Sequence, residues 1–288
     1  MAYAVDFFLV GGGAGGGSGS GRNGGGGGGR ILTGTDSLAA GAYPVVIGAG
    51  GATDTNGGDS TFNGHTALGG GRGANASNSA GNGGSGGGGS DAHIFAGTAD
   101  NSDGGIGSDA GDGEGTFGGG GGGGATQPGV RSIDSPNGGS GGDGLHSSFS
   151  GTAVWYAGGG KGNSTRTPVS GQGSGSGSYG GGGDYSAAGG PGLLILRAPL
   201  GTVNASGGTH SSDSTYDYWT FTSGATFTLH ELFSASLSVS MMNSASRLAT
   251  VGRAGVFART LADSIMNAAL RFVLLNKKSI RWGFFTWS

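Results

Sequence analysis

"YAVDFFLVGGGAGGG", residues 3–17, joins a strand-like segment directly to a run of glycines. In its first half the side chains alternate between two faces, with Val5, Phe7 and Leu9 on one face and Asp6, Phe8 and Val10 on the other. A strand that is apolar on both faces is covered on both. The sequence therefore predicts a buried strand that is followed at once by residues whose side chains cannot fill a core.

Glycine is concentrated in the first three quarters of the chain. Of the 76 glycines among 288 residues, 72 lie within residues 1–209. Collagen is excluded, because the glycines run in blocks without a G-X-Y period and the chain has only 6 prolines. Disordered chains are poor in aromatic residues, whereas 13 Phe, 7 Tyr and 4 Trp occur here, many at the borders of the glycine blocks. We therefore expect a folded, glycine-rich protein.

Further strands are predicted between the glycine blocks. Short apolar runs recur at 43–48 ("YPVVIG"), 153–160 ("AVWYAGGG") and 192–200 ("GLLILRAPL"). The segment "DYWTFTSGATFTL", residues 217–229, has two aromatic and β-branched arms around Thr222, Ser223 and Gly224. That pattern predicts a hairpin with those three residues as its turn.

The glycine blocks predict a core made of main chain. Ordering glycine loses more conformational entropy than ordering any other residue, so a folded protein keeps such blocks where the missing side chain is itself required. Glycine runs in the polyproline II conformation can pack side by side and exchange N–H···O=C bonds. The predicted fold class is therefore glycine-rich and mainly irregular or β, with bundled polyglycine II helices sealed by short β-strands and a small C-terminal α-helical segment.

The order of these pieces resembles a known family. "VDFFLVGGGAGGG", "GAYPVVIGAGG" (41–51), "GDSTFNGHTALGGGRG" (58–73), "VWYAGGGKG" (154–162) and "GGPGLLILRAPL" (189–200) are similar to the glycine-rich domain of tailed-phage tail-fibre and virion proteins. The receptor-binding adhesins of T-even-type tail fibres are among the relatives of this family. Their glycine-rich part resembles the packed polyglycine II helices that are predicted here. The resemblance implies a receptor-binding virion protein whose specificity lies in loops between the glycine runs. The chain departs from these adhesins because it lacks their N-terminal fibre-attachment region and ends in 59 residues without a counterpart.

That last part forms a second predicted segment, so the expected division is 1–229 and 230–288. Residues 1–229 hold 7 basic and 15 acidic side chains, whereas 230–288 hold 7 basic and 2 acidic ones. Apolar residues at helical spacing predict an amphipathic helix, and aromatic residues dominate the tail that follows it. Packing on the glycine-rich body, an attachment device and a membrane-surface helix remain open for this segment. The attachment hypothesis rests on Phe257, Leu261, Ile265, Phe272, Trp282, Phe284, Phe285 and Trp287.

Several classes of protein are excluded by the sequence. There is no cysteine, hence no disulfide or thiolate metal site. Gly11, Gly13 and Gly16 spell a dinucleotide-binding fingerprint, but the glycines that follow cannot form the helix that this motif needs. Neither a signal peptide nor an apolar run of membrane-spanning length is present. We therefore predict no enzyme, no cofactor, no nucleic-acid partner and no membrane insertion.

Two aspartate-rich segments leave calcium binding open. "GGSGGDGL" (138–145) matches a calcium-binding repeat that functions only in stacked copies, and solvated aspartates explain it equally. Asp100, Asp103, Asp109, Asp112 and Glu114 could take up a hard cation through their oxygen atoms.

The remaining candidates for binding are loops with diverse side chains on the glycine scaffold. Aromatic rings stack on sugar faces, and recognition residues are commonly placed on loops of a rigid scaffold. The predicted receptor-binding residues are His93, Phe95, Phe149, Trp155, Tyr179 and Tyr185. The alternative is that each aromatic residue caps the edge of the glycine core, and Trp155 favours it because it lies in a predicted strand.

Together with the resemblance, these loops predict a virion or tail-fibre adhesin that binds a bacterial outer-membrane protein or glycan and contacts other virion subunits. Its predicted location is the virion, after synthesis in a host cytoplasm. A purely structural virion or fibre-assembly protein is the main alternative. An ice-binding polyglycine II protein is a further one, which the irregular glycine spacing disfavours.

Overall fold

The computed structural model describes residues 2–101, 106–108, 110–113, 118–132, 138–163 and 168–231. The chain divides into two units, Met1–Glu231 and Leu232–Ser288. The predicted C-terminal helix, the aromatic tail and the eight candidate attachment residues all belong to the second unit and lie outside the described residues.

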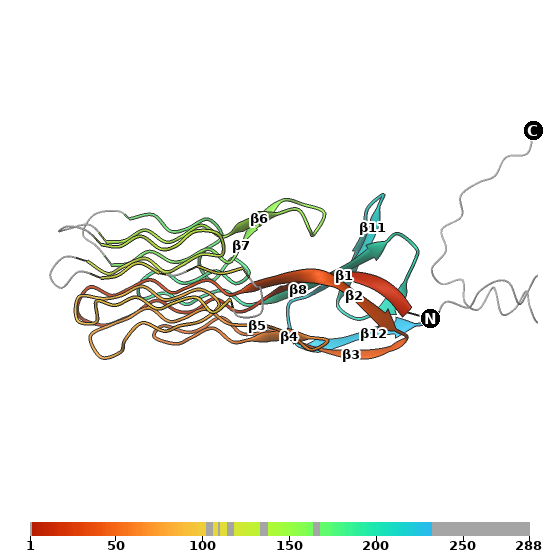
Figure 1. The fold of residues 1–288 in the computed structure, drawn as a ribbon, viewed down its shortest axis with the longest axis horizontal. Helices are drawn as coiled ribbons and strands as arrows, with labels where there is room; N and C mark the ends of the chain where they lie inside the picture. The colour runs from red at the N-terminus through yellow and green to blue at the C-terminus, as the bar shows by residue number, and fades with distance from the viewer. Residues whose placement is uncertain are drawn as a thin grey trace, which may run out of the picture. The chain divides into compact units, whose positions relative to one another are not determined.

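Twelve antiparallel strands in the described residues form three sheets (Figure 1). One five-stranded sheet has the order β10-β11-β8-β1-β2, another has the order β5-β4-β3-β12-β9, and β6 pairs with β7. The strands are β1 (Ala2–Val10), β2 (Ile31–Ala39), β3 (Gly41–Val46), β4 (Ser60–Phe62), β5 (His65–Ala67), β6 (Leu145–Ser147), β7 (Val154–Tyr156), β8 (Leu193–Pro199), β9 (Asn204–Ser206), β10 (Thr209–Ser212), β11 (Tyr216–Phe221) and β12 (Ala225–His230).

Strand β1 is covered on both faces, which confirms the prediction from its pattern. Val5, Phe7 and Leu9 belong to one buried cluster, whereas Phe8 and Val10 belong to another. The first cluster fills the space between the two five-stranded sheets, because β1, β8 and β11 of one sheet and β3, β4 and β12 of the other all contribute to it. The two sheets therefore form a sandwich with a side-chain core.

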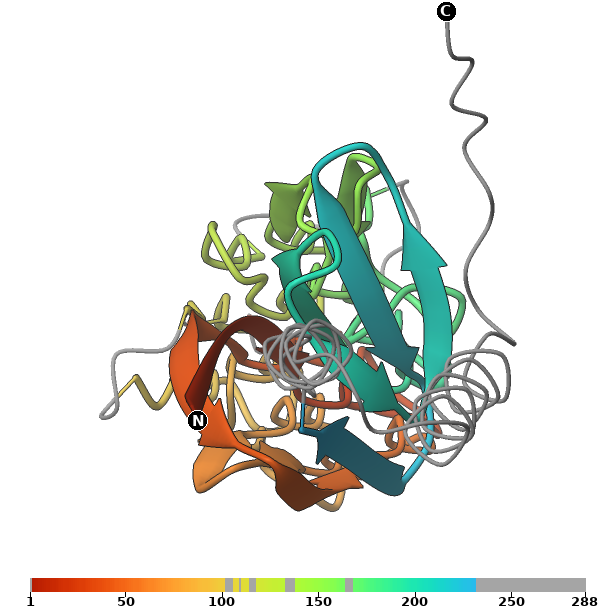
Figure 2. The ribbon, with the colours of Figure 1, turned by 90° about the vertical axis from the view of Figure 1, so that its right-hand side faces the viewer.

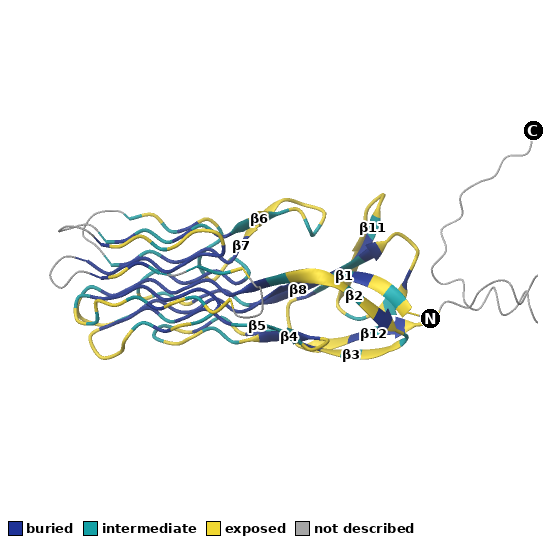
Figure 3. Ribbon diagram, viewed as in Figure 1, coloured by how far each residue is buried: buried dark blue, intermediate teal, exposed yellow. Residues whose placement is uncertain are grey.

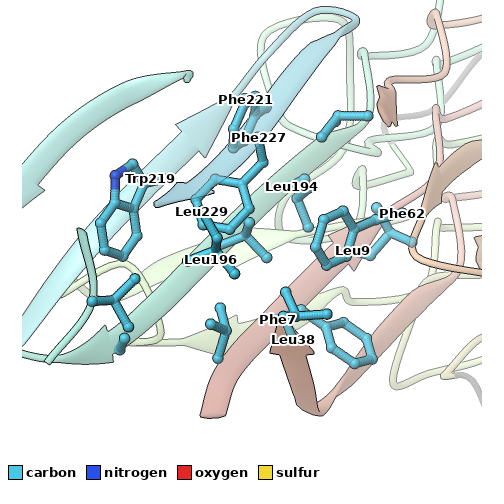
Figure 4. Packing of buried hydrophobic residues seen from close by; sticks show 14 of the residues in the cluster. Phe7, Leu9, Leu38, Phe62, Leu194, Leu196, Trp219, Phe221, Phe227 and Leu229 are labelled. Atoms are coloured by element: carbon cyan, nitrogen blue, oxygen red, sulfur yellow. The ribbon is translucent and has the colours of Figure 1, made fainter. Parts of the chain in front are cut away.

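Aromatic rings dominate the centre of this sandwich core (Figure 4). Phe227 of β12 lies edge-on to Trp219, with ring centroids 5.6 Å apart, and to Phe221, at 6.2 Å. Buried aromatic pairs in this geometry contribute about 0.5–1.5 kcal/mol beyond the area that they bury. The rings thereby join β11 of one sheet to β12 of the other.

The predicted hairpin at 217–229 is wrong, although both of its strands exist. Strand β11 pairs with β8 and β10, whereas β12 pairs with β3 and β9, so the segment 222–224 crosses from one sheet to the other. Phe221 and Phe227 both point into the shared core from opposite sheets. Burying both rings between two sheets outweighs the local pairing that the turn residues suggested.

The glycine runs extend from the strands and lie side by side (Figures 1 and 2). Consecutive residues donate to different neighbours: the N–H groups of Gly12, Gly13 and Ala14 bond to Gly58, Gly190 and Gly27 at 2.8–3.0 Å. This run is thus bonded to three neighbouring segments, one more than the two neighbours that a β-strand has. Most residues of the runs are buried, and exposure rises at the turns (Figure 3).

Close approach of the main chains explains the glycine content at these positions. A Cβ atom built on Gly12 would lie 2.2 Å from the carbonyl oxygen of Ala49, and one on Gly13 would lie 2.1 Å from that of Gly181. Neither distance is compatible with a side chain, so residues with a Cβ are excluded there. The expectation that the glycine runs pack main chain against main chain agrees with these contacts.

The predicted fold class is nevertheless wrong. The described residues contain three antiparallel sheets and no helix, so a bundle of polyglycine II helices with strands as mere seals does not describe this fold. The prediction failed because the strands carry enough apolar side chains to build a core of their own between two sheets. The fold is a β-sandwich from which the glycine-rich runs extend.

Candidate recognition surface

The polar loops between the glycine runs meet at the end away from the sandwich. Each of these loops joins a run that leaves the sandwich to a run that returns to it (Figure 1). We call them the distal loops, and they comprise residues 18–22, 52–55, 75–79, 90–96 and 184–187. Because they are loops on a hydrogen-bonded scaffold, they are the first place to look for binding residues.

The Asp54 carboxylate ties three of the distal loops together. It accepts hydrogen bonds from the backbone N–H of Ser18, at 2.8 Å, from the Ser18 hydroxyl and from the side-chain amide of Asn75. Partial burial opposes ionisation of Asp54, but these hydrogen bonds outweigh it and lower its pKa. The backbone of Asp54 is left-handed (φ 64°), a conformation that aspartate tolerates better than most residues do.

The loop 90–96 presents His93 and Phe95 from a fixed base. The hydroxyl of buried Ser90 accepts the N–H of His93 at 2.9 Å, and the N–H of Ser90 donates to the His93 carbonyl at 2.7 Å. On the other side, the N–H of Ala96 donates to Asp112 Oδ1 at 2.9 Å. Phe95 itself is 78% exposed. An apolar ring held out from a base fixed on both sides is suited to contact another molecule.

Tyr185 lies in another distal loop. Its N–H donates to the Lys161 carbonyl at 3.0 Å, and the neighbouring Ser186 N–H donates to the carbonyl of Gly17 at 2.8 Å. The Asp184 carboxylate also fixes this loop to Lys161. It accepts the N–H of Lys161 at 3.0 Å and pairs with the Lys161 ammonium group at 3.7 Å. Tyr185 is half-buried, so it presents less surface than Phe95 does.

The other three predicted receptor-binding residues lie elsewhere, near the sandwich. Phe149, in the β6–β7 loop, covers the outer face of the first sheet, with its ring 4.1 Å below the Arg197 guanidinium and 5.4 Å from Phe8. Tyr179 packs on the same buried cluster as Phe149. Trp155, on β7, is 37% exposed and lies against the His146 ring at 4.8 Å. The six candidates therefore form two separate groups.

The match with a known family covers the distal loops and the sandwich as far as the first residue of β12. A family model described as a glycine-rich domain matches residues 1–225. The chain belongs to the glycine-rich domain family. No curated protein and no solved structure matches it. The description of this family names no ligand.

Sequence reasoning missed the distal loops 18–22, 52–55 and 75–79 of this glycine-rich domain. The signal that marks these loops is their Asn, Asp and Ser residues, whose side chains form turns by hydrogen-bonding to the backbone a few residues away. Asn75 Oδ1 accepts the N–H groups of Ser77 and Asn78 at 2.8 and 2.7 Å, as such a turn requires. Polar interruptions between two glycine runs therefore mark the ends of the runs.

The acidic candidates for calcium binding are only partly described. Asp103, Asp109 and Glu114 lie outside the described residues, and Asp112 holds the N–H of Ala96. Within the ranges that the structure covers, no three His, Asp or Glu side chains are grouped as a metal site. No helix in the described part is long and apolar enough to cross a bilayer.

Proposed function

We propose that this glycine-rich domain protein is a bacteriophage tail-fibre or virion component that binds a bacterial cell surface through its distal loops. The observation that carries the proposal is the exposed ring of Phe95 on a loop whose base is fixed on both sides. Aromatic anchors of this kind contribute strongly to binding because they lose little conformational entropy. The ligand is an outer-membrane protein or a surface glycan.

The position of the two ends of the first unit supports the same proposal. Ala2 pairs with Ala39, and Leu229 pairs with Gly41, so both ends of the first unit lie in the sandwich (Figure 1). A protein attached to a larger particle through either end would leave its distal loops free. Attachment to other virion subunits is assigned to residues 230–288, and this part of the proposal rests on the sequence alone.

The test is adsorption of the fluorescently labelled full-length protein to a panel of bacterial strains, measured by flow cytometry. We expect saturable binding to some strains, and we expect Phe95→Ser to abolish most of it. The matched control is Leu200→Ser, because Leu200 is also exposed (50%) but lies in the turn directly after β8, beside the sandwich. Equal loss in both variants would count against the distal loops. Binding to isolated fibres but to no strain would favour the purely structural alternative.

A further inference from the structure

Three neighbouring glycine-rich segments present polar side chains at the surface of the packed runs. Arg72 lies between two buried glycines, and its carbonyl accepts the N–H of Gly81 at 2.9 Å. The N–H of Arg72 donates to the side chain of Asn56, on a third segment, at 2.9 Å. Asn56 and Asn82 are exposed, and Arg72 is half-buried. Their side chains therefore reach solvent from segments that are bonded to one another.

The two asparagines use their acceptors to hold the scaffold and keep their donors free. Asn56 Oδ1 accepts the N–H of Arg72, and Asn82 Oδ1 accepts the N–H of Thr98, both at 2.9 Å. Because the oxygen of each amide is bound to main chain, each Nδ2 group is left to donate elsewhere. Neither Nδ2 group donates a hydrogen bond to any residue that the structure describes. Each asparagine thus offers an NH₂ group to a ligand.

The Arg72 guanidinium is a further donor group without an acceptor. Among the described residues it makes no hydrogen bond and no ion pair, and its Nε is buried without a partner. Asp54 interacts with Arg72 electrostatically, but its carboxylate is bonded to Ser18 and Asn75 and forms no ion pair with Arg72. Leaving a buried donor of a charged group unpaired is unfavourable, so an acceptor from a ligand would stabilise it.

The missing side chain of Gly81 lets Asn56 and Arg72 meet. A Cβ built on Gly81 would lie 2.6 Å from Asn56 Oδ1 and 3.3 Å from Arg72 Cγ. Both side chains therefore border the space that a side chain at this position would fill. Asn82 follows Gly81 directly, so its NH₂ group lies one residue further along the same segment.

We propose that Arg72, with Asn56 and Asn82, forms a binding site for an oxyanion, which is the phosphate or carboxylate group of an anionic ligand. The guanidinium fork matches two oxygen atoms of such a group, and amide N–H groups can donate to its remaining lone pairs. Because the three side chains offer donors only, a negatively charged group that is rich in acceptors suits them best. That the group is carried by a glycan of the bacterial surface rests on the proposed function, whereas the oxyanion site itself does not.

The test titrates the ¹⁵N-labelled full-length protein with glucose 6-phosphate up to about 50 mM. We expect saturable shifts of the Asn56 and Asn82 side-chain NH₂ signals and of the Arg72 Nε–H signal, with a Kd of about 1–10 mM. Glucose should cause none of them. Glucuronate and inorganic phosphate identify the source of the group. Tighter binding of the two anionic sugars than of inorganic phosphate assigns the site to a glycan, and equal binding assigns it to free oxyanions; both results support an oxyanion site.

Exchanging asparagine for aspartate separates the scaffold from the site. Asn56→Asp keeps an oxygen that accepts the Arg72 N–H, but it replaces the free NH₂ group by a carboxylate oxygen beside the guanidinium. It should change Tm by less than about 2 °C and weaken glucose 6-phosphate binding more than about tenfold. The matched control is Asn204→Asp, which makes the same change of charge at an exposed residue of β9 in the sandwich and should leave binding unchanged.

A second variant tests the guanidinium directly. Arg72→Gln removes the charge and the fork, and it should weaken binding more than about fivefold without loss of stability, because this side chain holds no described residue. The proposal is overturned by equal shifts with glucose and glucose 6-phosphate, by the absence of saturable shifts with all three anions, by equal binding in Asn56→Asp and Asn204→Asp, or by unchanged binding in Arg72→Gln. Phe95→Ser should leave the titration unchanged, so a failure of this site and a failure of cell adsorption are told apart.

Discussion

Replacing Gly122 by alanine tests whether main-chain packing stabilises the glycine-rich runs. A Cβ on Gly122 would lie 2.0 Å from the carbonyl oxygen of Gly26 and 2.5 Å from its carbonyl carbon. Cβ atoms in proteins essentially never approach another heavy atom within 3.0 Å, so the two runs would have to separate by about 1 Å. The obstacle is backbone on both sides, so no side chain can rotate out of the way.

The magnitude follows from the hydrogen bonds at this contact. Gly160 bonds to both residues: its N–H donates to the Gly26 carbonyl at 2.9 Å, and its carbonyl accepts the N–H of Gly122 at 2.8 Å. A shift of about 1 Å exceeds the range in which such bonds persist. One buried hydrogen bond left unmade costs about 1–3 kcal/mol, and overpacking adds about 1–3 kcal/mol. We therefore expect a loss of about 2–6 kcal/mol and a fall in Tm of about 5–20 °C.

The assay is thermal unfolding followed by circular dichroism, with urea unfolding as a second measure. The matched control is Gly177→Ala, because a Cβ at Gly177 has no heavy atom within 4 Å and its backbone is not left-handed. This control should leave the free energy of unfolding unchanged or raise it by up to about 1 kcal/mol, since alanine restricts the unfolded chain. A Gly122→Ala protein as stable as Gly177→Ala would refute the argument that the missing side chain is what allows these runs to pack.

Three further predictions concern the loops and the outer face of the first sheet. Because its hydrogen bonds lower the pKa of Asp54 below the ordinary 3.8, its contribution to stability is complete above that pH and is lost as pH falls through the lower folded value. The protection factor of the Ser18 amide, which is the intrinsic exchange rate at a given pH divided by the measured rate, should therefore fall below about pH 4 and stay constant from pH 5 to 7. Phe95→Ala should leave Tm unchanged, because the ring is largely exposed, while reducing cell adsorption. Phe149→Ala should lower the free energy of unfolding by about 2 kcal/mol through lost contacts with Phe8 and Arg197, measured by urea unfolding.

Strands with dense apolar residues could be predicted from the sequence, whereas polar strands could not. The run from Tyr3 to Val10 and the run "GLLILRAPL" are strands as expected. Strand β2 was missed because Thr33, Gly34 and Thr35 interrupt any apolar pattern. Its partner β1 and the sandwich determine that it is extended, and neither is visible locally.

One missed hairpin did have a local signal. Strands β4 and β5 are joined by Asn63 and Gly64, both left-handed (φ 45° and 83°), as a two-residue turn between antiparallel strands requires. Asn-Gly is the strongest short signal for such a turn. It was overlooked because the flanking strands have only three residues each.

The candidate site was only partly predictable, for a reason of geometry. Sequence indicates which loops interrupt glycine runs, but not at which end of a run each loop lies. His93 and Tyr185 follow runs that lead away from the sandwich, whereas Trp155 precedes such a run and stays beside the first sheet. The direction of each run depends on how many turns separate it from the preceding strand. That number cannot be read from composition.

The glycine runs and the buried cluster on the outer face of the first sheet depend on each other. Ala125 and Ala157, which lie within or next to glycine runs, belong to the same buried cluster as Phe8 and Val10 of the first sheet. A Cβ on Gly180 would lie 2.6 Å from Val10 Cγ1, so a run also meets the sheet at van der Waals distance. Glycine runs alone have no apolar side chains whose burial could offset their large loss of entropy. Their order, and with it the fixed position of the distal loops, therefore depends on both the hydrogen bonds between runs and this contact with the sheet. Substitutions that remove apolar side chains from the outer face of the first sheet should therefore make the distal loops less ordered, even though no distal-loop residue is changed.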